Sequence, residues 1–186
     1  VALSKSRQVI VFTHRLSLLA DLDQEVGSQG LSRSLVGLYK EPWGDGEPGL
    51  PPMHTQKTKS AINTLIAKVP EGRNIHQEHG SEQYSWWAKA ICSEARITLE
   101  RVIEFDLLAD VVQRFRRPIN TKGKLANVAK VTPVDCEYID SLMTKLSKFE
   151  HAQPGEAPVI MPNPDELDLL LTGLKNWRDS FVTRQV

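Results

Sequence analysis

The first apolar run, over residues 9–12, predicts a buried β-strand. Four consecutive apolar residues, three of them β-branched, end at the polar pair Thr13-His14. Continuous apolarity is typical of a strand covered on both faces, as in a parallel sheet, because a half-exposed strand would alternate. Apolar residues then recur at helical spacing over 16–26, and a second short strand is predicted over 34–40. The chain therefore begins with a predicted β-α-β element over residues 1–41.

A segment rich in proline and glycine, residues 42–52, follows this element. It holds four prolines and three glycines, which favour an exposed loop. Beyond it the hydrophobic pattern is helical. The sequence therefore predicts three parts: the β-α-β element at 1–41, the loop at 42–52 and a helical domain at 53–186.

The first half of the helical domain contains two apolar faces. One spans residues 61–69 and is expected to end at Pro70-Glu71-Gly72, since proline and glycine terminate helices. The other spans residues 84–115 and stops at Pro118. It predicts one long helix, or two helices with a kink near Asp106.

Two further helices have well-defined start signals. Thr132-Pro133-Val134-Asp135 and Asn163-Pro164-Asp165-Glu166 each supply an N-cap side chain, a proline in the first turn and an acid at the third position. The stripes expected to be buried are Tyr138, Ile139, Leu142, Met143, Leu146 and Phe149 on the first helix, and Leu167, Leu170, Leu171, Leu174, Trp177 and Phe181 on the second.

The predicted fold class is mainly α with a small β-α-β element at the N-terminus. Two strands and one helix cannot cover both faces of a sheet, and such a unit is not stable by itself. We therefore expect the strands to find partners in a preceding segment or in a second copy of the chain.

Composition narrows the class of protein further. The chain has 186 residues, 40% of them hydrophobic, with 23 basic residues balancing 23 acidic ones. Such a chain can bury a core, so disordered, collagen-like and disulfide-scaffold classes are excluded. No apolar run approaches the roughly 20 residues of a membrane-spanning helix. The first residues lack the pattern of a secretory signal, so we expect a cytoplasmic protein without membrane contact, with Cys92 and Cys136 reduced.

His14 is the leading candidate for chemistry. It follows the carboxyl end of the predicted parallel strand, where open α/β sheets place groups that contact ligands. In nucleotide hydrolases a polar side chain at such a position can reach the γ-phosphate and orient the attacking water. The alternative is a histidine that only caps the following helix. The chain contains no G-x-x-x-x-G-K-[ST] loop and no strand ending in paired acids, so we expect no ATP hydrolysis by this chain alone.

A second candidate site is electrostatic. Residues 111–130 contain six basic side chains and no acid. A flexible cationic loop can follow a phosphate backbone, whereas the alternative is a solvated helix end whose cations complement the helix dipole. The predicted nucleic-acid-binding residues are Arg114, Arg116, Arg117, Lys122 and Lys124.

No metal site is predicted. His76 and His79 have a spacing compatible with two ligands on one helix face, but no third ligand lies nearby in the sequence. A pair of surface histidines is the simpler interpretation. The two cysteines lack metal-ligand spacing and read as small core residues.

Several of these segments resemble a known class of ATPase. Residues 8–16 are similar to the switch-histidine strand near the C-terminal end of ABC-type ATPases of the SMC, RecF and RecN kind. Four later segments resemble the helical tail of bacterial AAA-family ATPases of that class: residues 97–104, 111–117, 132–136 and 162–167.

The resemblance implies that the chain is the C-terminal lobe of a longer protein. The phosphate-binding loop, the signature motif and the magnesium-binding acids would lie upstream, and ATP and magnesium would be cofactors of the intact protein. His14 would contact the γ-phosphate in an ATP-sandwich dimer, and Arg15 would support that loop. The work implied is ATP-driven and DNA-related, in repair or defence.

Two alternatives follow from the residues themselves. One is a free-standing helical interaction module, such as a small mobile-element protein, that forms a homodimer through its unpaired strands. The other is a sequence-independent DNA binder that uses the basic segment.

Overall fold

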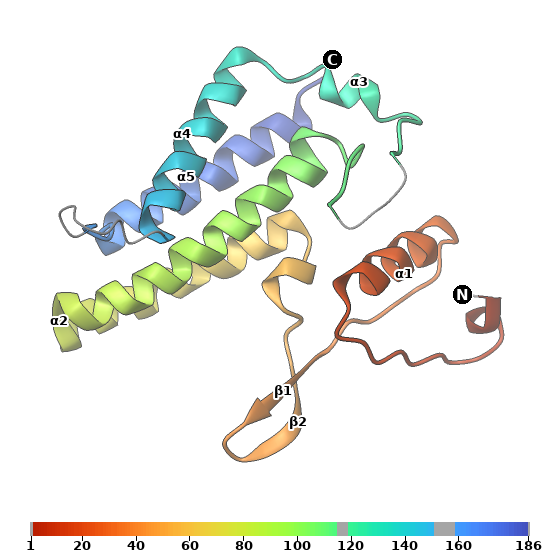
Figure 1. Ribbon diagram of the computed structural model, residues 1–186, viewed down its shortest axis with the longest axis horizontal. Helices are drawn as coiled ribbons and strands as arrows, with labels where there is room; N and C mark the ends of the chain where they lie inside the picture. The colour runs from red at the N-terminus through yellow and green to blue at the C-terminus, as the bar shows by residue number, and fades with distance from the viewer. Residues whose placement is uncertain (1, 115–118, 151–158, 186) are drawn as a thin grey trace.

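A computed structural model describes residues 2–114, 119–150 and 159–185 (Figure 1). Its regular elements in chain order are η1 (Ala2–Lys5), α1 (Leu16–Ser28), β1 (Gly37–Glu41), β2 (Gly44–Gly49), η2 (Met53–Thr55), α2 (Thr58–Val102), η3 (Ile103–Leu107), α3 (Leu125–Val128), α4 (Pro133–Glu150) and α5 (Pro164–Thr183). The chain is therefore mainly helical with a small β element near its N-terminus, as the sequence predicts.

The long helix α2 reverses direction at Gly80. This residue has φ 80° and ψ −177°, which are not helical values, and it divides α2 into a first arm, residues 58–79, and a second arm, residues 81–102. The two arms lie side by side and antiparallel, and α4 and α5 pack against them (Figure 1). The described residues thus form a bundle of four helical rods in an up-down-up-down order.

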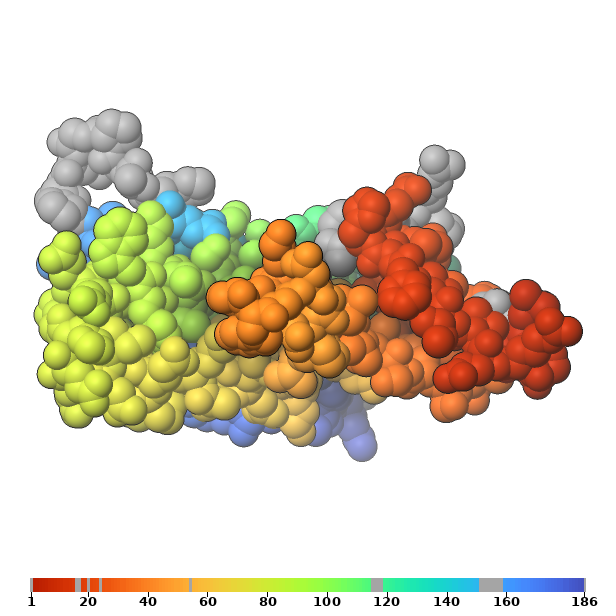
Figure 2. All heavy atoms as spheres, turned by 90° about the horizontal axis from the view of Figure 1, so that it is seen from below, coloured from red at the N-terminus to blue at the C-terminus, as the bar shows by residue number. Residues whose placement is uncertain are grey.

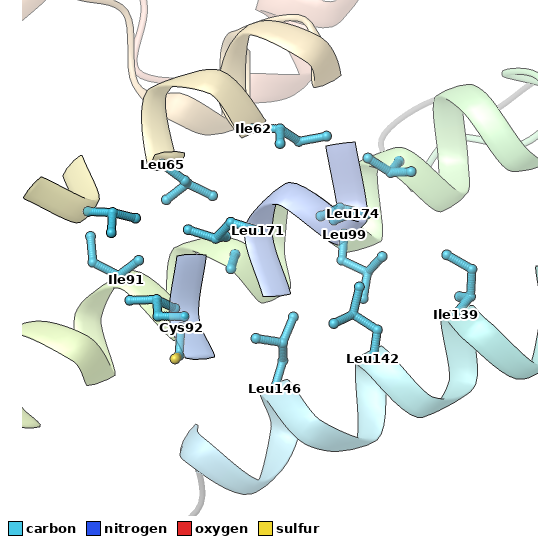
Figure 3. Packing of buried hydrophobic residues seen from close by; sticks show 14 residues of the cluster. Ile62, Leu65, Ile91, Cys92, Leu99, Ile139, Leu142, Leu146, Leu171 and Leu174 are labelled. Carbon is cyan, nitrogen blue, oxygen red and sulfur yellow. The ribbon is translucent and has the colours of Figure 1, made fainter. Parts of the chain in front are cut away.

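One apolar core lies between these rods. Figure 3 shows its side chains converging from both arms of α2, from α4 and from α5. Its fully enclosed members include Ile62, Leu65, Cys92, Leu99, Leu146, Leu167, Leu171 and Leu174.

The predictions for α4 and α5 are confirmed. Both begin at the proline of the predicted start signal, and both bury the predicted stripes. At α5, Asn163 Oδ1 accepts the backbone N–H groups of Asp165 and Glu166 at 3.0 and 2.9 Å, and the Asn163 N–H donates to Glu166 Oε2 at 2.8 Å. This reciprocal capping satisfies donors that a helix N-terminus leaves unpaired.

The predicted helix end at Pro70-Glu71-Gly72 is wrong, because the first arm continues to residue 79. Pro70 is exposed on the outer face, where water can satisfy the carbonyl that loses its partner. Gly72 is buried because Trp87 of the second arm packs directly against it. The glycine therefore lets the two arms approach closely and does not terminate a helix.

The helix that is predicted to continue as far as residue 115 ends earlier. The second arm stops at Val102 and continues as the π-helix η3, and residues 108–114 form neither a continued helix nor the second helix expected after a kink near Asp106. Two non-glycine residues with positive φ, Ala109 at 51° and Asp110 at 59°, then turn the chain away. Left-handed backbone prevents further α-helix at this point.

The predicted β-α-β arrangement is replaced by an α-β-β order. The second predicted strand forms as β1, but it pairs antiparallel with β2, which lies in the segment predicted to be a loop. Pro42 occupies the two-residue turn between the strands, a position that its fixed φ favours. The ring of Tyr39 lies over Gly37 and Gly49 and shields the backbone that these glycines leave bare.

Residues 9–12, predicted to be a central strand, are not paired with any described segment. They lie in extended chain before α1, with exposed fractions of 46% for Val9, 70% for Ile10, 50% for Val11 and 79% for Phe12. The N-terminal arm, which we define as residues 2–50, stands beside the bundle (Figure 2). A β-strand needs backbone hydrogen bonds to a neighbouring strand, and no described segment supplies one to residues 9–12.

Among the described residues, no helix has both the length and the apolarity needed to cross a lipid bilayer.

The approach of the two arms at Gly72 yields a stability prediction. Gly72→Ala places a methyl group where the Trp87 indole already lies, so we expect the unfolding free energy to fall by about 1–3 kcal/mol. Gly27→Ala is the matched control, because nothing lies within 4 Å of the added Cβ and the position is an exposed helical glycine. Urea unfolding followed by circular dichroism measures both. Equal stabilities of the two variants would contradict the packing argument.

Candidate functional site

His14 lies at the exposed junction between the extended segment and α1. The hydroxyl of Thr13 accepts the backbone N–H of Arg15 at 3.0 Å, which fixes the turn into the helix. Arg15, at the N-cap, makes no side-chain capping bond, and the first turn of α1 carries no acid. His14 therefore presents its imidazole to solvent beside a helix N-terminus, without a described partner for catalysis.

Arg114 is held by two glutamates of the preceding helices. Its Nη1 donates to Glu100 Oε2 at 2.5 Å, and its Nε donates to Glu104 Oε1. These hydrogen bonds, despite desolvation of the guanidinium, raise the pKa of Arg114 above its ordinary value. Its side chain is 49% exposed, whereas those of Glu100 and Glu104 are 22% and 15% exposed. The cation thus lies at the rim and the carboxylates lie beneath it.

Lys124 is also paired within the chain. Its Nζ contacts Asp110 Oδ2 and donates to the Asp110 backbone carbonyl at 3.3 Å. Asp110 is one of the two left-handed residues that follow η3. Left-handed backbone costs a non-glycine residue about 1–2 kcal/mol, so the lysine contact stabilises a strained corner.

Three predicted cations remain, namely Lys122, Arg116 and Arg117. Lys122 is exposed and forms no ion pair with another described residue. Arg116 and Arg117 lie outside the described residues. The structure therefore brings Arg114 and Lys124 to the corner that follows the second arm of α2, and it shows no contact between this corner and His14.

The glutamates at this corner belong to a longer polar chain. Glu100 also pairs with Arg96 at 3.4 Å, and Arg96 pairs with Glu150 near the end of α4 at 2.6 Å. Ser93 donates to Glu150 at 2.8 Å. The pair Arg96 and Glu100 has helical spacing that sequence inspection could detect. The pairing of these glutamates with Arg114 depends on the turn at Ala109 and Asp110, and no regular spacing in the sequence indicates it.

A buried carboxylate, Asp135, ties the C-terminus of α5 to the start of α4. Its side chain is 3% exposed, and it accepts hydrogen bonds from Arg184 Nη1 at 2.6 Å and Nη2 at 3.0 Å. Trp177 Nε1 donates at 3.0 Å, and Thr132 Oγ1 donates at 2.7 Å. The hydrogen bonds from Arg184, and after it Thr132 and Trp177, hold the pKa of Asp135 well below its usual range. The sequence marks Asp135 as a capping acid but gives no sign of Arg184.

A second largely buried pair joins α5 to η3 and to the start of α2. Arg178 donates to both carboxylate oxygens of Asp106, at 2.8 and 3.1 Å, and to Thr58 Oγ1 at 3.1 Å. The side chains of Arg178 and Asp106 are only 13% and 12% exposed. The two-pronged geometry satisfies both partners, which a buried ion pair requires. Asp106 in the π-helix therefore serves packing between helices.

The chain offers few groups for metal or thiol chemistry. Within the described residues, no cluster of three or more histidine, cysteine or acidic side chains could hold a metal ion. His76 lies 3.4 Å from Ser81 Oγ and edge-on to the Tyr84 ring. Burial raises the pKa of the Cys92 thiol to about 12, so this cysteine stays protonated at neutral pH.

No family model, curated protein or solved structure matches this chain.

The Asp135 cluster predicts an acid-dependent loss of stability. Because the folded-state pKa of Asp135 is depressed, its stabilisation is present above the unfolded pKa of about 3.9 and is lost as the pH falls through the folded pKa. We expect Asp135→Asn to lower the unfolding free energy at pH 7 by about 2–3 kcal/mol. The variant should also lose less stability than the wild type when the pH falls from about 5 to 2.

Chemical denaturation across this pH range provides the measurement. Asp140→Asn, on the exposed face of the same helix, is the control and should match the wild type. An acid response of Asp135→Asn as steep as that of the wild type would show that other carboxylates are responsible.

Proposed function

We propose that this chain is the C-terminal lobe of an ATPase of the SMC-like class, and that residues 9–12 form a strand in a sheet supplied by the preceding segment. The observation that carries the proposal is the exposure of these four apolar residues in extended chain directly before His14. The fold of the bundle does not require this segment. Its chemistry fits the interior of a sheet.

The apolar exposure is concentrated in the N-terminal arm. Among the described residues, eleven of the 21 exposed large apolar side chains lie before residue 51, including Trp43 at 75% and Leu50 at 73%. In the same described part of the chain, the fully buried apolar side chains lie at or after Ala61. Exposed apolar surface on this scale marks an interaction site in a soluble protein. The exposed apolar surface of the arm therefore supports the proposal that the arm packs against a further segment of an ATPase lobe.

His14 and Arg15 are the groups that this chain would bring to a nucleotide. Placed at the end of the completed strand, His14 would hydrogen-bond the γ-phosphate and orient the attacking water. The proposal assigns the remaining phosphate contacts and the magnesium ligands to the preceding segment, since neither motif occurs in this sequence. ATP would supply the free energy for conformational work on DNA.

The proposal predicts where ATP turnover will reside. The purified chain should hydrolyse no ATP, whereas the longer protein read from the upstream coding sequence should do so. His14→Ala should lower kcat of the longer protein at least about 100-fold, as expected for loss of a positioned acid-base group. His79→Ala at the exposed reversal of α2 is the control and should leave turnover unchanged. An upstream sequence without a phosphate-binding loop, or turnover insensitive to His14→Ala, would overturn the proposal.

The second candidate is a helical module that dimerises through the arm. The self-contained core of the bundle favours it, because every apolar side chain that the structure describes as buried belongs to residues 61–181. In this case the apolar surface of residues 9–12 would be covered by a second copy.

Polar substitutions in the extended segment distinguish the two candidates. Ile10→Ser with Phe12→Ser should change the unfolding free energy of the bundle by no more than about 0.5 kcal/mol, because both side chains are exposed. If the chain is an ATPase lobe, the isolated chain is a monomer with or without these changes, and they abolish turnover in the longer protein. If the chain is a dimeric module, sedimentation will show a wild-type dimer that the substitutions convert to a monomer.

A further inference from the structure

Arg114 and Lys124, two of the predicted nucleic-acid-binding residues, form ion pairs with carboxylates that lie outside residues 111–130. Arg114 is paired with Glu100 and Glu104, and Lys124 is paired with Asp110. Residues 111–130 contain no acid, so these partners come from the helices and the corner that precede the segment.

We propose that Arg114 and Lys124 form a DNA-binding site that is held closed by Glu100, Glu104 and Asp110, and that a DNA phosphate backbone opens it by replacing these carboxylates. The ligand chemistry is that of a chain of phosphate monoanions, recognised without regard to sequence. The inference rests on the DNA-related part of the proposed function.

The placement of Arg114 makes such a replacement accessible. About half of its side chain faces solvent, while both glutamates are largely covered. A phosphate can therefore approach the guanidinium from the solvent side while the bundle stays folded. Only Nε and Nη1 are engaged by the glutamates, and a guanidinium can bind phosphate through two parallel N–H groups.

The closed state is also held together by weak interactions. Partly exposed ion pairs contribute little to stability, whereas each cation that binds a phosphate of DNA releases a condensed counterion. Lys124 and Gln113 both contact the carboxylate of Asp110, which is left-handed like its neighbour Ala109. Exchange of the carboxylate for a phosphate would let this corner relax.

The polar chain connects the corner to the bundle. Glu100 is shared between Arg114 and Arg96, and Arg96 reaches Glu150 of α4. When Arg114 leaves Glu100, Arg96 remains as the partner of Glu100 and Glu150. DNA binding at the corner is therefore coupled to the contact between α2 and α4.

The test compares two double variants with equal changes in charge. Glu104→Gln with Asp110→Asn removes two of the masking carboxylates, and Glu137→Gln with Asp140→Asn removes two exposed carboxylates of α4. Gln keeps the shape of Glu104, and Asn tolerates the left-handed conformation of residue 110. Binding is measured by fluorescence anisotropy with a mixed-sequence DNA duplex of about 20 base pairs, over a range of about 50 to 200 mM salt.

We expect the unmasked variant to bind this duplex about tenfold more tightly than the wild type, with a salt dependence steeper by about two counterions. The α4 control should gain less than about threefold, since a distant change in net charge acts only through the screened long-range field. Addition of Arg114→Gln and Lys124→Gln to the unmasked variant should remove the gain.

Three outcomes would overturn the inference. These are equal affinities of the two double variants, a gain that survives loss of Arg114 and Lys124, and a complete lack of binding by the unmasked variant. A gain restricted to an RNA duplex of the same sequence would overturn the assignment to DNA. These measurements use this chain alone, so their result is independent of ATP turnover in the longer protein.

Discussion

The reversal of α2 at Gly80 is the constraint on which the bundle depends. An uninterrupted helix of 45 residues would extend about 68 Å, and its two apolar stripes could not face each other. The left-handed φ of Gly80 folds the helix back, and the absence of a side chain at Gly72 allows Trp87 to close the gap between the arms. The two arms therefore lie side by side, and α4 and α5 pack against them (Figures 1 and 3).

Polar contacts fix the two ends of this bundle. At the end near the reversal, Tyr84 donates to the Pro162 carbonyl at 2.8 Å, and Arg73 pairs with Asp168 at 2.8 Å. At the opposite end, Asp135 and Arg178 anchor the last turns of α5. Because buried charges are costly unless they are fully paired, the contacts of Asp135 and Arg178 select one register of the helices. Arg114 belongs to a separate chain of ion pairs, which runs through Glu100 and Arg96 to Glu150.

The N-terminal arm follows a different physical rule. Its elements are formed by local forces, namely the amphipathic spacing of α1 and the turn and ring packing of the β hairpin. Eleven of its described large apolar side chains are exposed. The bundle buries a cluster of apolar side chains in its own core, whereas the arm contributes none to that cluster. This contrast within one chain is the basis of the proposal that the arm binds a partner.

The sequence by itself determined the features encoded in neighbouring residues: the mainly helical class, the capped starts of α4 and α5, their buried stripes, and the cationic character of residues 111–130. The tertiary structure decided the features that depend on which segments meet. It left residues 9–12 without a ladder, since strand formation needs a neighbour, and it gave Pro70 and Gly72 places inside a helix, since burial and solvent exposure outweigh local propensity. It also paired Arg114 and Lys124 with acids. Local pattern reports what a segment can bury or bind, but only the folded chain places the partner that completes or masks it.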